Sequence, residues 1–265
     1  LPMSTRVGDG LVTDSRLAMV SFTGSARAGW DIRARAGRKK VTLELGGNAP
    51  LIVDQTADVS HAVARTVAGG FKYAGQLCIS VQRAFVHRSV WDEFVGGLVK
   101  GAAALRVGDP LDEATQVGPM ISVEAAERTV SWLDEAVDAG ARILTGGEAD
   151  GAYVAPSVIE NVPATARLAV EEAFAPVVVV TPFDDLDDAF VAANDSPYGL
   201  QAGFFTRDVH RMWAAYETLD VGALVIMPFG GVKSSGLGRE GVRWAIADMT
   251  EERLLVLAPE AGGTP

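Results

Sequence analysis

The stretch LELGGNAPLIV, residues 43–53, decides the fold because it joins two strand candidates through a pair of glycines. An apolar run at 41–45 precedes Gly46 and Gly47, and a second apolar run at 51–53 follows them. Adjacent glycines give the backbone unusual conformational freedom, so the chain can pass there from one structural unit into another. The pattern therefore predicts a hinge or domain boundary at this pair.

Glu44 stands inside the first of these runs, between Leu43 and Leu45. Strand positions of this kind are normally buried, and a buried carboxylate without a partner costs several kcal/mol or gives up its charge. The position therefore indicates that Glu44 has either a partner or a chemical task.

Outside this stretch, short β-rich runs alternate with longer segments of helical periodicity. Several runs are apolar without alternation, which is typical of strands buried on both faces of a sheet. The strand candidates lie at 17–22, 41–45, 51–53, 81–87, 177–183, 203–205, 223–226 and 253–257. Alternating strands and helices predict an α/β protein with a largely parallel sheet.

The composition excludes several classes of function. The chain has 265 residues, 48% hydrophobic and 22% charged, and a formal net charge of −11, which disfavours nucleic acid and anionic membranes as partners. A single cysteine allows neither an internal disulfide nor a cysteine-based metal cluster, so we expect no metal site and a reducing, cytoplasmic location. The longest strongly apolar stretch, 174–183, is interrupted by prolines and is shorter than the roughly 18 residues that a membrane span needs.

The segment SFTGSARAG, residues 21–29, leaves a strand, turns at Gly24 and Ser25 and enters a helix that contains Gly29. A helix N-terminus after a glycine turn presents unpaired N–H groups and a positive dipole end, which suits a pyrophosphate. An ordinary strand-to-helix turn with a serine cap is the alternative. A G-x-G-x-x-G spacing occurs only in GLGREG, 236–241, where no apolar strand precedes it, so we interpret it as a loop and helix entry.

Cys78 lies in YAGQLCISVQR, between a helical segment that ends near Gly75 and a strand that begins near Ile79. A lone cysteine is often a small buried hydrophobe, but a loop between helix and strand can also present a reactive thiol beside backbone N–H groups. The three histidines, His61, His87 and His210, share no ligand spacing. A Cys-His hydrolase stays open as an alternative, because the two partners need not be close in sequence.

Five short motifs follow one another along the chain: FTGS, LELGG, GQLC, EEAFAP and PFGGVKSSGLGREG. The sequence resembles the NAD(P)-dependent aldehyde dehydrogenases from about residue 12 to 257. The resemblance implies that Cys78 is the nucleophile and Glu44 the general base, with NAD or NADP as cofactor and a small aldehyde as substrate. The cofactor-binding residues that it implies are Gly24, Ser25, Gly29, Leu45, Glu172 and Phe174, of which Glu172 holds the nicotinamide ribose and Phe174 flanks the ring.

The same resemblance implies a domain organisation. Residues 1–46 correspond to a remnant of a Rossmann-type dinucleotide-binding domain, and residues 47–250 to an α/β catalytic domain. Residues 251–265 resemble a C-terminal strand that pairs across subunits, so we expect a homodimer or homotetramer.

The sequence departs from the family pattern in three places. It has no counterpart of the long N-terminal stretch that supplies a lysine for the adenosine ribose and an asparagine for the oxyanion hole. A loop is absent between Ile226 and Met227, and Ala175 replaces a glycine. We expect the first difference to weaken cofactor binding, the second to remove part of the wall of the substrate tunnel, and the alanine to be tolerated.

The chemistry that the resemblance implies is oxidation of an aldehyde to a carboxylic acid through a hemithioacetal and a thioester on Cys78, with water activated by Glu44. The segment GQLCISVQR resembles members that act on small polar aldehydes such as lactaldehyde or phosphonoacetaldehyde. A catalytically inactive homologue that binds partners and a cysteine-dependent esterase are the alternative functions.

Overall fold

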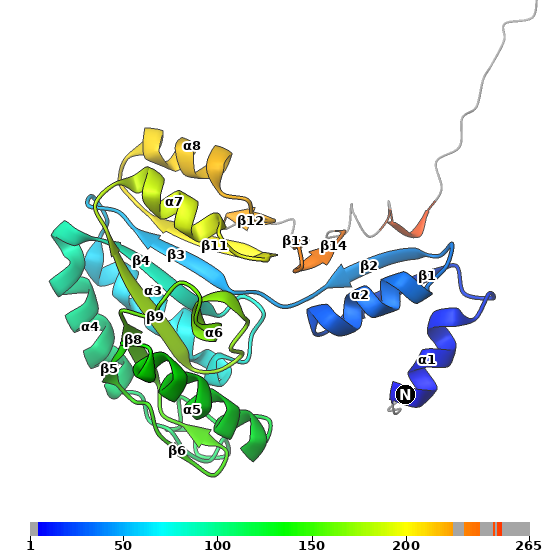
Figure 1. Ribbon diagram of the computed structural model, residues 1–265, viewed down its shortest axis with the longest axis horizontal. Helices are drawn as coiled ribbons and strands as arrows, with labels where there is room; N and C mark the ends of the chain where they lie inside the picture. The colour runs from blue at the N-terminus through cyan, green and yellow to red at the C-terminus, as the bar shows by residue number, and fades with distance from the viewer. Residues whose placement is uncertain (1–4, 225–230, 239–245, 247, 251–265) are drawn as a thin grey trace, which may run out of the picture.

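The computed structural model describes residues 5–224, 231–238, 246 and 248–250, and it has the α/β architecture that the sequence predicts (Figure 1). The fold has a large sheet and a small sheet, and the extended connection after β2 (Lys40–Glu44) joins them. Two short antiparallel pairs, β6–β7 and β10–β13, complete the described sheets.

The large sheet has seven strands, which pair in parallel except at the β5 edge. All five residues of β3 are buried, as expected for an unalternating strand covered on both faces. In spatial order the strands are β12 (Ala223–Leu224), β11 (Gln201–Phe205), β3 (Ala49–Val53), β4 (Val81–His87), β9 (Val177–Phe183), β8 (Ser157–Glu160) and β5 (Arg142–Thr145).

Helices cover both faces of this sheet. Leu51 and Val53 of β3 belong to the core on the side of α3, α4 and α5, whereas Ile52 belongs to the core under α7 and α8. Side chains alternate across a strand, so one apolar strand supplies both cores. The helices are α3 (Val59–Phe71), α4 (Trp91–Ala103), α5 (Val123–Asp138), α6 (Arg167–Val170), α7 (Leu186–Asn194) and α8 (Val209–Thr218), with short 3₁₀ turns at η1 (Lys72–Gly75) and η2 (Arg88–Val90).

The small sheet has the order β1–β2–β14, with β1 (Met19–Thr23) parallel and β14 (Gly236–Leu237) antiparallel to β2. It carries α1 (Thr5–Thr13) and α2 (Ala26–Arg35), which lie on one side of it in Figure 1. Every β1 residue is at least partly exposed, in contrast to β3. The small sheet is therefore the less buried unit among the described residues.

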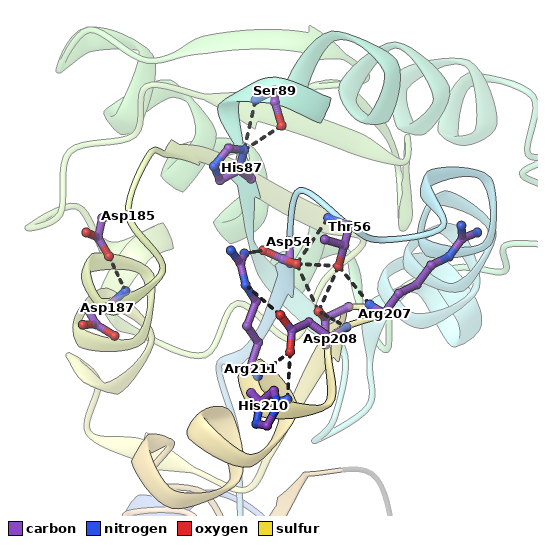
Figure 2. A network of polar contacts seen from close by, with 11 residues as sticks. Asp54, Thr56, His87, Ser89, Asp185, Asp187, Arg207, Asp208, His210 and Arg211 are labelled. Atoms are coloured by element: carbon purple, nitrogen blue, oxygen red, sulfur yellow. Dashed lines mark hydrogen bonds and ion pairs between the residues drawn. The ribbon is translucent and has the colours of Figure 1, made fainter.

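A polar network around the buried Asp54 closes the large sheet where β3 and β11 end (Figure 2). Asp54 is fully buried, accepts hydrogen bonds from Thr56 and Thr206 and pairs with Arg211. Asp208 caps α8 by accepting hydrogen bonds from the first backbone N–H groups of that helix. The side chains that cap the neighbouring elements in the same way are Asp58 on α3, Asp185 on α7 and His87 on η2.

The strand predictions for 81–87 and 177–183 are confirmed residue by residue. The sequence missed the strands between 142 and 160, because runs of two to four residues have no measurable period. The prediction of a loop at Gly236 is wrong, since Gly236–Leu237 is a strand beside β2. The predicted terminal strand at 253–257 and the gap between Ile226 and Met227 lie outside the described residues.

Candidate active site

The predicted site residues gather where the two sheets meet. The carboxyl ends of β1 and β2 face this junction, and the chain segments that precede β3, β4 and β9 lie on its other side. The residues at the junction come from three distant parts of the chain, around 44–48, 76–80 and 171–176.

The glycine pair of the opening stretch sits between the other two segments. A β-carbon at Gly46 would lie 2.2 Å from Glu172 Oε2, and one at Gly47 would lie 2.3 Å from the carbonyl oxygen of Cys78. At Gly47 the neighbouring atom is backbone, so glycine is required there for the two segments to approach this closely, whereas a side chain at Gly46 would displace the Glu172 carboxylate. The backbone N–H of Gly47 also donates to Glu172 Oε1 at 2.9 Å.

Cys78 lies in the turn between η1 and β4 and is partly exposed. Tyr73, Ala74 and Gly75 before it all have positive φ, which reverses the chain within three residues. A β-carbon at Gly75 would lie 2.0 Å from the carbonyl oxygen of Ala175, so the turn is packed directly on the backbone next to Phe174. This is the reason for a glycine in the Cys78 motif.

Gln76 fixes this turn to the loop before α5. Its amide donates to the carbonyl of Pro119 at 3.2 Å and accepts from the N–H of Ile121 at 2.7 Å. The backbone that leads to Cys78 is thereby held from a second direction.

Glu44 ends β2, the central strand of the small sheet, and is 6% exposed. Its neighbours across the sheet are Thr23 and Gly236. The N–H of Gly24 donates to the carbonyl of Glu44 at 3.0 Å, and the N–H of Leu45 donates to the carbonyl of Ser235 at 2.9 Å. The position is thus fixed by backbone bonds on both sides, three residues before Gly47.

Glu172 has an electrostatic environment suited to a functional carboxylate. Burial raises the pKa of Glu172, while the N–H of Gly47 and the charge of Arg128 oppose that rise. The pKa of Tyr198 in β10 (Tyr198–Gly199) is raised by burial and then by the charge of Glu172, so Tyr198 lies near this carboxylate. A carboxyl group with a displaced pKa at a junction of two sheets is typical of a functional site.

Phe174 is 39% exposed and adopts φ 48°, a left-handed conformation that is uncommon for a bulky residue. It lines a surface cavity of about 770 Å³ together with Gln76 and Leu77, which directly precede Cys78. Lys72 is the single charged residue among the described side chains that line this cavity.

The remaining predicted residues divide into two groups. Gly24 and Ser25 are exposed at the N-terminus of α2, where Ser25 Oγ accepts from the N–H of Ala28 at 3.3 Å. Gly29 and Leu45 are buried and touch each other, since a β-carbon at Gly29 would lie 2.3 Å from Leu45 Cδ2. The geometry gives this second pair a packing role between α2 and β2, and their contact with a cofactor stays a prediction.

Three buried polar residues at the site were not predicted from the sequence: Asn48, Gln82 and Arg83 are 2%, 4% and 6% exposed. Their side chains bond to the backbone around Glu172 or to each other. The available signal was the pair of polar residues in VQRAFVH, inside a strand that is otherwise apolar and buried on both faces.

The histidines lie at the opposite ends of the strands. His87 ends β4 and His210 lies in the first turn of α8, both in the region of Figure 2, and His61 packs edge-on against Phe205 at the end of β11. Within the described parts of the chain, no three His, Cys, Asp or Glu side chains are grouped as a metal site. None of the helices described here is long and apolar enough to cross a membrane.

Comparison with known protein families gives one clear match, in which the model described as "Aldehyde dehydrogenase family" matches residues 2–255. The chain is 42% identical over 261 residues to 3-sulfolactaldehyde dehydrogenase of Priestia megaterium, covering 95% of this chain and 55% of that protein. It is 41% identical over 262 residues to lactaldehyde dehydrogenase of Methanocaldococcus jannaschii, covering 95% and 56%. The chain spans about half the length of the curated relatives it matches.

Solved structures agree with this match. Aldehyde dehydrogenase 21 of Physcomitrella patens, in complex with the reaction product succinate, has a TM-score of 0.94 at 42% identity and covers 98% of this chain and 56% of that one. The glyceraldehyde-3-phosphate dehydrogenase GapN of Methanocaldococcus jannaschii, complexed with NADP, has a TM-score of 0.88 at 43% identity, covering 92% and 55%.

Proposed function

Because this chain belongs to the aldehyde dehydrogenase family, we propose that it oxidises a small aldehyde to the carboxylic acid with NAD⁺ or NADP⁺, using Cys78 as nucleophile and Glu44 as base. One observation supports the proposal most: the Cys78 backbone and the Glu172 carboxylate both pack against Gly46 and Gly47, which follow Glu44 in the chain. Assembly as a homodimer or homotetramer stays a prediction.

The nucleophile is needed because an aldehyde has no leaving group. Addition of the Cys78 thiolate to the carbonyl carbon forms a C–S bond and makes that carbon tetrahedral, and loss of hydride then leaves a thioester. The turn that carries Cys78 is held by Gln76 and by the packing of Gly75, so the thiol is presented from a fixed backbone.

Several residues fit a dinucleotide. The exposed N-terminus of α2 at Gly24 and Ser25 suits a pyrophosphate, Glu172 suits a ribose hydroxyl, and the exposed Phe174 offers an apolar face. NAD(P)⁺, when bound, supplies the acceptor for the hydride. Neighbours bound to NADP support this choice of cofactor, and the GapN structure is one of them.

Glu44 is the proposed base for the second half of the reaction. It takes a proton from the water that attacks the thioester, the C–S bond breaks, and the Cys78 thiolate is released with the carboxylic acid. Its place at the buried end of β2, two residues before Gly46, supports this role.

The substrate that we propose is a short aldehyde with a hydroxyl or acidic group. Relatives named for 3-sulfolactaldehyde and lactaldehyde support the size and polarity. Lys72 supports the acidic group, because it brings a positive charge to the cavity lined by Gln76 and Leu77 in a chain with a net charge of −11.

The proposal is tested in a longer protein that joins this chain to an upstream cofactor-binding region, by rapid mixing with NAD⁺ or NADP⁺ and lactaldehyde or 3-sulfolactaldehyde. Glu44→Gln should give a burst of NAD(P)H near one equivalent per site and then turnover slower by about 10²–10⁴-fold, as expected for loss of a general base. Cys78→Ala should give no burst, and Glu171→Gln, which alters an exposed neighbouring acid, should behave like the parent.

Steady turnover of Glu44→Gln at the parent rate would show that another group is the base. Absence of NAD(P)H formation in the parent protein, with all aldehydes and both cofactors, would favour the inactive homologue. Ester cleavage without cofactor as the only activity would favour the esterase.

A further inference from the structure

The segment that carries Glu172 has little regular structure of its own. Only the single turn of α6 precedes it, and β9 begins after it. Side chains from neighbouring elements must therefore satisfy much of the backbone around Glu172.

Gln82 of β4 holds the chain on both sides of Glu172 at once. Its Nε2 donates to the carbonyl of Glu171 at 2.8 Å and to that of Leu168 at 2.9 Å, and its Oε1 accepts from the N–H of Ala173 at 2.9 Å. One amide thus bonds to the residue before and the residue after Glu172. Only a side chain with both donor and acceptor atoms can do this.

Asn48 adds a second support from the other end of the glycine pair. Its Nδ2 donates to the carbonyls of Ala169 and Glu171, both at 3.1 Å. Asn48 directly follows Gly47, whose N–H donates to the Glu172 carboxylate. The Asn48 side chain therefore ties the backbone next to the donor, Gly47, to the backbone next to the acceptor, Glu172.

Arg83 fixes Asn48 in turn. Its Nε donates to Asn48 Oδ1 at 2.9 Å, and its other nitrogens bond to the carbonyls of Ala192 and Ala193 near the C-terminal end of α7. Burial lowers the pKa of Arg83 to about 10, which leaves it charged at neutral pH. A cation at a helix C-terminus is favourable, so this anchor is stable.

We propose that Gln82 is a positioning residue for Glu172, with Asn48 and Arg83 as its support, and that it sets cofactor affinity by holding the Glu172 carboxylate against Gly47. The affinity part rests on the proposed function, whereas the positioning part concerns the Glu172–Gly47 contact itself. The side chain of Gln82 needs no contact with the reacting atoms for this role.

The experiment uses two readouts on Gln82→Met, which keeps the volume and removes the amide, and on Gln82→Glu, which keeps the acceptor and removes the donor. The first readout is a pH titration of the Gly47 backbone amide by nitrogen-15 NMR, which reports the Glu172 carboxylate without cofactor. The second is the dissociation constant of NADH and NADPH by fluorescence. Thr66→Val is the control, because it removes a buried hydrogen bond to Ala62 in α3, away from Glu172.

In the parent protein and in Thr66→Val, the Gly47 amide should follow one titration above the ordinary glutamate pKa. Both Gln82 variants should lose most of that amplitude and bind cofactor about tenfold more weakly, the effect of one charge-assisted hydrogen bond. In a Glu172→Gln background, Gln82→Met should change affinity by less than about twofold, because it acts through Glu172.

An unchanged Gly47 titration in folded Gln82→Met and Gln82→Glu would overturn the proposal, whatever the cofactor does. A normal cofactor affinity in Glu172→Gln would instead show that the proposed function assigns Glu172 wrongly, and the Gly47 titration would still decide the role of Gln82.

Discussion

The two ends of the large sheet differ in how their polar groups are used. At the end where β3 and β11 stop, Asp54 is enclosed by hydroxyl groups and Arg211, and the following helices are capped by side chains. At the end where β3 and β4 start, two glycines, a left-handed Phe174 and a partly buried Glu172 meet a second sheet. Parallel sheets usually bind ligands at their carboxyl ends, but here that end is closed, and the proposed site lies at the other.

The carboxylates at these two ends also have opposite electrostatic environments. Burial acts to raise the pKa of Asp54, but hydrogen bonds from Thr56 and Thr206 and the charge of Arg211 outweigh it, so the pKa lies below its usual value. Burial dominates at Glu172 and raises the pKa of that group. The Asp54 end is therefore built for stability, whereas the Glu172 end keeps a carboxylate whose charge costs free energy.

The largest effect that tests this difference is on stability at the Asp54 end. Asp54→Asn should lower the free energy of unfolding by about 3 kcal/mol, near the lower limit for a broken buried ion pair, because the Arg211 side chain is 31% exposed. Urea titration followed by circular dichroism measures the change. Asp184→Asn is the control, since it breaks an exposed pair with Arg88 and should cost less than about 1 kcal/mol.

An equal cost for Asp54→Asn and Asp184→Asn would contradict the stabilising role of the buried network. A loss of turnover in folded Asp54→Asn comparable to that in a Cys78 variant would contradict the separation of the two ends.

A smaller effect, on turnover, is expected from Gly47→Ala at the other end. The added β-carbon would lie 2.3 Å from the carbonyl oxygen of Cys78, so the Cys78 backbone must move and turnover per folded molecule should fall by about 10- to 100-fold. Gly203→Ala in β11 is the control, because its β-carbon would lie 3.6 Å from Leu51, an ordinary contact. Parent-like turnover in folded Gly47→Ala would remove the structural reason given for the glycine pair.

The smallest effect is the pH dependence of stability, for which the two carboxylates predict opposite signs. Because the pKa of Asp54 is lowered on folding, its contribution is present above the unfolded value of about 3.9 and is lost as pH falls through the folded pKa. Because the pKa of Glu172 is raised, its charge destabilises the fold increasingly as pH rises from about 4.3 to its folded pKa.

Thermal unfolding between pH 3 and 8 measures both contributions. Relative to the parent, Asp54→Asn should lose stability as the pH rises to about 3.9 and change little above it, whereas Glu172→Gln should gain stability as the pH rises above about 4.3. Parallel pH profiles for the two variants would contradict the opposite environments described above.

The sequence predicted the strands whose residue pattern extends over many residues. Runs rich in β-branched and aromatic residues predicted β4 and β9 to the residue, and the glycine pair lies in the connection between the two sheets. The Gln82 amide could not be predicted, because its partners are backbone groups some 90 residues further along the chain. The Asp54 network was missed for the same reason, since Thr206 and Arg211 join it from another strand and helix.

The short connection between β2 and β3 also has a mechanical consequence. Only residues 45–48 separate the two strands, and four residues span at most about 14 Å when fully extended. A load that pulls the sheets apart is therefore transmitted at once to the backbone at Gly46 and Gly47 and to the Gly47–Glu172 hydrogen bond. We therefore expect tension between the sheets to act on the Gly47–Glu172 contact before it disturbs the cores beneath the helices.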